Sequence, residues 1–169
     1  MITGEQIRLC AFERRHLNET RVWVNDAELA RLLDRARPVS DLEHEQWFAK
    51  LHDRDDCVFF AIEAHADDSH IGNVWLWDID WRHRRAELRI LIGSKEHHGR
   101  GAGSEAISLL CDYAFKRLNL HKVYAYVLSI NERARSAFEK AGFIIEGTLS
   151  EDRWVDGRYV DVYLLGKIR

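Results

Sequence analysis

The sequence contains little that would divide it into parts or cross-link it. Among 169 residues there is one proline, Pro38, and no stretch rich in serine and glycine, so nothing marks a linker. We expect a single domain over residues 1–169, a length that can bury a sizeable core. The three cysteines lie far apart and form no Cys-x-x-Cys pair. An odd, scattered set is more typical of reduced thiols in a cytoplasm than of a disulfide framework.

Other absences argue against whole classes of partner. No apolar run approaches the ~18 residues of a membrane-spanning helix, and the first residues lack the charged and apolar segments of a secretory signal. We therefore expect a cytoplasmic protein with no membrane partner. A net charge of −3 gives no reason to expect nucleic acid. The nine histidines show no metal-ligand spacing, so we expect no metal.

The order of apolar patterns indicates a mixed α/β fold. We expect a twisted central sheet of about seven strands with helices on both faces, because strands and helices do not alternate strictly. A capping box, Ser40 with Glu43, marks one helix start, and Asn131 marks another. Strands are predicted over 6–12, 58–63, 70–78, 86–92, 123–128, 143–150 and 159–168. Helices are predicted over 17–24, 40–51, 102–118 and 132–141, with a further helical turn within 25–39.

One stretch, residues 87–106, indicates a buried strand, a short connection, a glycine-rich turn and a helix start. Glycines at Gly99, Gly101 and Gly103 permit backbone conformations that other residues resist, and they leave room for close approach. The amides of such a turn point outward at a helix N-terminus, where negative charge is favoured. The turn therefore predicts a phosphate or pyrophosphate cradle. The alternative is a helix-start loop with no ligand.

Three motifs, at residues 98–103, 131–143 and 156–161, resemble the GNAT superfamily of acyl-CoA-dependent N-acyltransferases. The chain is most similar to the branch that holds ribosomal-protein N-terminal, spermidine and nucleotide-sugar amine acetyltransferases. Residues 82–88 resemble the spermidine enzymes in particular. The resemblance implies a GNAT fold, with acetyl-CoA as co-substrate.

The resemblance also implies which residues bind the donor. Backbone groups of Leu91, Ile92 and Gly93 would hold the pantetheine arm and the thioester carbonyl, and Asn131 would contact the arm from the other side. Asn131 as a simple helix cap is at least as well supported. The amides around the pyrophosphate would be those of His98, Gly99, Arg100, Gly101, Ala102, Gly103 and Ser104.

The proton donor is less well defined. Phe138 lies in the donor site at the position where many relatives have a tyrosine that serves the departing thiolate. It cannot donate a proton, and it fits the apolar stripe of its helix. Tyr124, Tyr126 and Ser129 are weaker candidates, and departure without an acid is the alternative.

Glu87 is the predicted catalytic base, because similar enzymes often carry a carboxylate on this strand that acts through water. The competing interpretation is an ion pair with Arg85 or Arg89 on the same strand face. Six tryptophans could wall an acceptor pocket, although core packing is the commoner role of tryptophan. Four carboxylates could attract a cationic amine or simply form a solvated rim; they are Asp78, Asp80, Glu151 and Asp152.

These features predict an acetyl-CoA-dependent N-acetyltransferase that moves an acetyl group to a primary amine by direct attack on the thioester. The acceptor would be a small molecule such as a polyamine, an amino sugar or an aminoglycoside-like compound. The alternatives are an acetyltransferase for protein N-termini and a CoA-binding module with little turnover. A homodimer is the default expectation for the assembly, since it is the commonest one.

Overall fold

The computed structural model describes residues 1–169 and contains one eight-stranded sheet in the order β1-β2-β3-β4-β5-β6-β8-β7. The mixed sheet confirms the predicted fold class, with one strand more than expected because residues 2–3 pair with β2. All neighbours are antiparallel except β5 and β6. The strands are β1 (Ile2–Thr3), β2 (Ile7–Ala11), β3 (Val58–Ala64), β4 (His70–Asp80), β5 (Arg85–Ile92), β6 (Lys122–Leu128), β7 (Ile144–Val155) and β8 (Arg158–Ile168).

The five α-helices begin and end close to the predicted positions. Ser40 and Glu43 form the expected capping box at the start of α3, and Asp26 caps the further helical turn that became α2. No helix of the fold is both long and apolar enough to cross a membrane. The helices are α1 (Leu17–Asn25), α2 (Ala27–Leu32), α3 (Asp41–Leu51), α4 (Ala102–Lys116) and α5 (Glu132–Lys140), with short 3₁₀ turns at Arg14–His16 and Lys95–His97.

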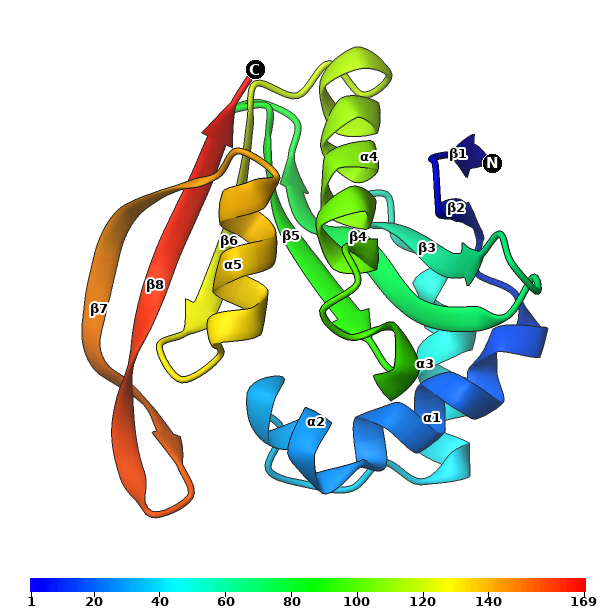
Figure 1. Cartoon of the computed structure of the whole chain (residues 1–169), viewed down its shortest axis with the longest axis horizontal. Helices are drawn as coiled ribbons and strands as arrows, with labels where there is room; N and C mark the ends of the chain where they lie inside the picture. The colour runs from blue at the N-terminus through cyan, green and yellow to red at the C-terminus, as the bar shows by residue number, and fades with distance from the viewer.

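The main core lies between the sheet and the helices α4 and α5, which stand beside each other in front of the sheet in Figure 1. Side chains alternate along β4, as its sequence predicts. Val74 and Leu76 belong to this main core, whereas Trp75 belongs to a smaller cluster on the opposite face with residues of α1 and α2. The two faces of the central strands are therefore covered by different helices.

The central strands separate at the parallel junction. β5 and β6 pair only from Arg85 opposite Lys122 to Glu87 opposite Tyr124. Beyond that point the two strands no longer pair with each other, although β5 stays paired with β4 and β6 with β8, and Figure 1 shows them diverging above α2. The backbone groups that face this gap have no partner strand, so the gap connects the two faces of the sheet.

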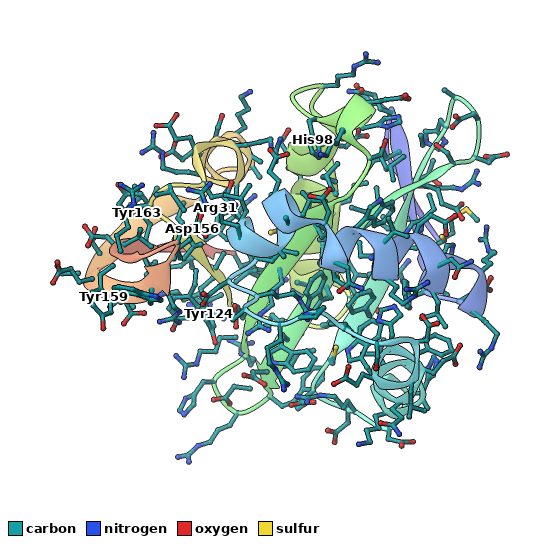
Figure 2. All side chains as sticks on the ribbon, turned by 90° about the horizontal axis from the view of Figure 1, so that it is seen from below. Arg31, His98, Tyr124, Asp156, Tyr159 and Tyr163 are labelled. Carbon is teal, nitrogen blue, oxygen red and sulfur yellow. The ribbon has the colours of Figure 1, made fainter.

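The β7–β8 hairpin is tied to the α2 region by two ion pairs. Arg31 of α2 pairs with Asp156 at the hairpin turn, and these two side chains meet in Figure 2. Arg153 of β7 places its Nε 2.9 Å from an oxygen of Asp34, which follows α2. The turn itself has left-handed backbone at Asp156 and Gly157, the conformation that an Asp-Gly hairpin turn favours.

Candidate active site

A cavity of about 700 Å³ occupies the gap between β5 and β6. A smaller cavity of about 170 Å³ lies at the glycine turn. Six residues line both cavities, so the two adjoin at the splayed strands and the end of α2: Leu32, Leu33, Ile90, Leu91, Asn131 and Ala134. This arrangement offers one site on the side of α4 and α5 and another on the side of α1–α3.

The glycine turn has the open backbone that its sequence predicts. Gly99 and Gly101 have φ angles of 73° and 94°, and a Cβ built at Gly99 would meet no atom within 4 Å. No backbone hydrogen bond uses the amides of Gly99, Arg100 or Gly101, and the first-turn amides of α4 have no acceptor within the helix. These amides fit a bound pyrophosphate, because they are unpaired and unobstructed.

Not every predicted residue of the turn faces the small cavity. His98, Gly99, Gly101, Gly103 and Ser104 line it, whereas the side chain of Ala102 is buried and Arg100 is absent from its wall. Two basic side chains that the sequence reasoning missed, from Arg133 and Lys140 of α5, also line it. Their charge complements a phosphate-bearing ligand.

His98 fastens the turn to its surroundings. Its Nε2 donates to the carbonyl of Ile92 at 2.7 Å, and Arg133 donates to its Nδ1, also at 2.7 Å. A guanidinium only donates, so Nδ1 must accept and Nε2 must carry the proton. The amide of His98 is also occupied, by the carbonyl of Lys95. In this structure His98 positions the turn and the end of β5 and offers no free amide.

The structure also corrects the part expected of Gly93. Its amide donates to the carbonyl of Ile71 at 2.9 Å, so it is not free to hold a ligand. A Cβ at this position would lie only 1.8 Å from the ring of Trp23. Gly93 is required for close packing against α1. Leu91 and Ile92 do line the small cavity.

Asn131 and Phe138 lie on α5 beside the gap. Asn131 accepts a hydrogen bond from the Ala134 amide at 3.1 Å, which confirms its role as helix cap, and it also lines both cavities. Phe138 is buried and packs edge-on against Phe143 with ring centroids 5.0 Å apart, which confirms its place in the core. It contributes an apolar wall to the large cavity.

Glu87 is a buried carboxylate in the wall of the large cavity. Arg89, two residues along β5, donates to both of its oxygens at 2.8 Å, so one of the two expected ion pairs is confirmed. Burial opposes the charge of Arg89, but the hydrogen bonds to Glu87 together with the negative charges of Glu87 and Asp78 outweigh it and raise the pKa of Arg89. Burial and the neighbouring charge of Glu87 raise the pKa of Tyr124, which is labelled in Figure 2.

Aromatic side chains line the large cavity on the side of α1–α3. Trp75 stacks on Phe59 with centroids 4.8 Å apart, and Trp47 meets Phe59 edge-on at 5.4 Å. Trp77 completes the wall and lies opposite Glu87 in the β4–β5 register. Trp23 supports Gly93 instead, and the two remaining tryptophans, Trp81 and Trp154, are exposed.

The carboxylates proposed as an acidic rim do not line the cavity. Its wall holds two carboxylates, from Asp34 and Glu87, and three arginines, Arg35, Arg89 and Arg153. His44 of α3 also faces it. The sequence reasoning missed Asp34, Arg35, His44 and Arg153, because these residues lie in segments without a motif.

The sequence comparisons agree with this geometry. Residues 6–144 match the family model described as "Acetyltransferase (GNAT) domain". The chain belongs to the GNAT family of acetyltransferases. It is an N-acetyltransferase that uses acetyl-CoA as donor.

Curated relatives of this acetyltransferase include two spermidine N(1)-acetyltransferases. The protein from Vibrio cholerae is 39% identical over 121 residues, which are 71% of this chain and 68% of the relative. The protein from Escherichia coli K12 is 32% identical over 160 residues, which are 94% and 84% of the two chains. A crystal structure of the Vibrio cholerae enzyme in complex with CoA and spermine superposes with a TM-score of 0.89 at 32% identity, over 98% of this chain and 96% of that one.

One buried polar cluster of the acetyltransferase lies outside the cavities. Cys10, His16 and Glu63 bring three possible metal-ligand atoms within 4.8 Å of one another. Their atoms already have partners, because Arg8 and Arg15 bind the carboxylate of Glu63 and His16 lies 3.2 Å from it. Two arginines beside a single carboxylate disfavour a further cation, so this cluster fits a structural role.

Proposed function

We propose that this acetyltransferase moves the acetyl group of acetyl-CoA directly to the primary amine of a small molecule in the gap between β5 and β6. The proposal rests on two cavities that meet in this gap. The small one lies beside the free amides of the glycine turn, and the large one lies beside the buried carboxylate of Glu87. All 169 residues would serve this one domain.

The glycine turn would hold the pyrophosphate of the donor through the free amides of residues 99–104, with Arg133 and Lys140 adding positive charge. Leu91 and Ile92 line the path toward the gap, and Asn131 and Phe138 face it from α5. The donor supplies an acetyl group activated as a thioester.

The acceptor must lose a proton before its nitrogen can attack, because an alkylammonium has a pKa of about 10.4. Glu87 would bind the ammonium and pass its proton to water, since Arg89 leaves lone pairs of both oxygens available. The C–N bond then forms as the C–S bond breaks, the acylated nitrogen gives up its second proton to water, and the thiolate takes up a proton to leave as the CoA thiol. Phe138 cannot supply that proton, so water is the proposed source.

The relatives bear on the acceptor. Two of them are spermidine acetyltransferases by name, and one related structure holds spermine. They support polyamines as acceptors, and amines of this class are the first to test. Another structure of the Vibrio cholerae enzyme, with a TM-score of 0.82 at 33% identity, is described as dodecameric. A homo-oligomer is accordingly part of the proposal.

The test combines thiol release and donor binding. We expect CoA thiol to be released from acetyl-CoA in the presence of a small-molecule amine, and calorimetry to detect acetyl-CoA binding without an amine. Thiol release only with peptides would indicate an acetyltransferase for protein N-termini. Donor binding without release for any amine would indicate a CoA-binding module, the reading that Phe138 motivates.

A matched pair of glycine variants tests the donor site. Gly99 and Gly157 have left-handed φ angles of 73° and 83°, and a Cβ at either would meet no atom within 4 Å. Alanine at either position strains the backbone by about 1–2 kcal/mol. We expect Gly99→Ala to weaken CoA binding about tenfold, because the strain shifts the amides that bind the pyrophosphate. A loss of ~1.4 kcal/mol in binding free energy corresponds to a factor of ten in Kd. Gly157→Ala should leave CoA affinity unchanged in the same calorimetric titration, and equal losses would remove the turn from the donor site.

A further inference from the structure

One imidazole in the wall of the large cavity has an unused polar atom. His44 of α3 is 6% exposed, and its Nε2 is buried with no hydrogen-bond partner. The ring is fixed against the indole of Trp47, with centroids 5.0 Å apart and 20° between the planes. A buried polar atom without a partner raises the free energy of the protein, so a ligand that donates a hydrogen bond to it is favoured.

The unused nitrogen of His44 is a hydrogen-bond acceptor. Burial lowers the pKa of His44, so the ring is neutral and carries one proton and one lone pair. A hydrogen bond with the backbone of Leu17 opposes this shift, as it does where a ring N–H donates to a carbonyl. Because Nε2 has no partner, that bond belongs to Nδ1 and the lone pair is on Nε2.

Three aromatic rings adjoin His44 in the same wall. Trp47 meets Phe59 edge-on, and Phe59 stacks on Trp75. All three rings are partly exposed and line the large cavity. The guanidiniums that lie over aromatic rings elsewhere in the protein cover none of these three. Their free faces can therefore receive an ammonium group of a ligand.

We propose that His44, Trp47, Phe59 and Trp75 form a second amine subsite for a polyamine acceptor. An N–H of the second nitrogen would donate to Nε2 of His44, and the aromatic faces would stabilise its positive charge. The first nitrogen would meanwhile react at Glu87. This inference rests on the proposed function and names the residues that select a polyamine. His44 would determine specificity without touching the acetyl group.

The register of the sheet separates this subsite from Glu87 by the length of a polyamine. Glu87 lies opposite Trp77, and Trp75 lies opposite Phe59 on the next strand. All four side chains line the large cavity. From Glu87 to Phe59 the sheet runs across two strand spacings and along two residues, which separates their Cα atoms by roughly 12 Å. Only a long acceptor, such as spermidine, can reach both places.

The charges around the subsite permit an ammonium there. Arg21 and Arg35 help to lower the pKa of His44, but Arg21 is paired with Asp41 and Arg35 is exposed to solvent. Water weakens the repulsion that an exposed charge exerts. The other two arginines of the cavity wall are both paired with carboxylates. The second nitrogen would thus meet mainly aromatic faces and one lone pair.

A matched pair of amines tests the subsite when thiol release is measured. The compounds 1,7-diaminoheptane and octylamine are equal in length and differ at one end, which is an amino group in the first and a methyl group in the second. We expect kcat/KM for the diamine and for spermidine to exceed that for octylamine at least about tenfold, because the methyl group can form neither contact. The gain should appear in KM, since the subsite does not touch the acetyl group.

Variants of His44 assign the gain to its lone pair. His44→Phe keeps a flat ring beside Trp47 and should lower kcat/KM for the diamine about tenfold, and that for octylamine much less. His44→Gln, whose amide oxygen can replace Nε2, should restore part of the preference. His52→Phe is the matched control, because His52 ends the same helix and packs edge-on against Phe48 but lies outside the cavity wall.

The inference is overturned if the unchanged protein uses the diamine and octylamine equally well, or if His44→Phe slows both equally. Calorimetry of spermidine binding to the CoA-bound protein gives a reading that does not require turnover, and His44→Phe should weaken this binding about tenfold. If no amine releases thiol although acetyl-CoA binds, the proposed function fails. The subsite fails separately, when spermidine binds the unchanged protein and His44→Phe with the same affinity.

Discussion

Replacing Glu87 with glutamine is expected to lower kcat/KM for amine acetylation by about 100-fold at neutral pH, the size typical of a lost general base. The amide matches the carboxylate in shape but can neither neutralise an ammonium nor accept its proton. Since Glu87 lines the large cavity and not the small one, the affinity for CoA should stay the same. Thiol release across a pH series and calorimetry with CoA measure the two quantities.

The pH series separates chemistry from structure. If Glu87 assists deprotonation, the loss should shrink at high pH, where the free amine becomes abundant. Glu146→Gln provides a matched control, because Glu146 is also a carboxylate paired with a cation, Lys122, but lies outside both cavities. A rate equal to that of the unchanged protein would remove Glu87 from the mechanism, and an equal loss at every pH would assign it to positioning.

The largest effect on stability is expected at Glu63. Its side chain is 1% exposed and accepts from Arg8 and Arg15 at 2.7 and 2.8 Å. Glu63→Gln should lower the free energy of unfolding by about 3 kcal/mol, because it removes the buried partner of Arg8, which is itself mostly buried and keeps only its pair with the exposed Asp68. The midpoint of thermal unfolding should fall by roughly 6–12 °C for a chain of this size. Urea unfolding followed by circular dichroism measures the change.

Glu63 also predicts that the stability of the fold decreases at acid pH. Burial opposes ionisation of Glu63, but hydrogen bonds from Arg8 and His16 outweigh it and lower its pKa from 4.5 to about 2. Because this pKa is lower in the folded than in the unfolded chain, ionised Glu63 stabilises the fold at pH values above its unfolded pKa. This contribution is lost as the pH falls from about 4.5 toward 2. The stability difference between the unchanged protein and Glu63→Gln should therefore narrow over that range.

Asp68→Asn is the control for Glu63→Gln, since Asp68 pairs with the same Arg8 but is 71% exposed. Exposed ion pairs contribute about 0–1 kcal/mol, so the substitution should change stability little. If both variants lost a similar free energy of unfolding, burial would not increase the stability that this cluster contributes.

Local patterns predicted most of the fold. The capping box of α3 and the cap at Asn131 are short-range features, and both are present. Alternation along β5 also placed Glu87 and Arg89 on one face, which is why their ion pair could be expected. The glycine turn was recognisable because its conformation depends on residue type within a few positions.

Contacts between distant segments could not be predicted in this way. Gly93 packs against Trp23, which lies 70 positions earlier, so its amide has a role that strand pattern alone does not reveal. Arg35 stands in an irregular segment, and its place in the cavity follows from how α2 and α3 are joined. The buried network at Glu63 likewise joins residues of β2, β3 and the turn before α1.

The divergence of β5 and β6 has a consequence for the order of events in turnover. Two compounds that approach through adjoining cavities and touch only within that opening must be bound together when transfer occurs. A relay through an acylated cysteine is disfavoured, because the three thiols lie outside both walls and burial raises their pKa values to about 11 or 12. Initial-rate plots at several fixed amine concentrations should accordingly give intersecting lines, the signature of a ternary complex, and not the parallel lines of a ping-pong cycle.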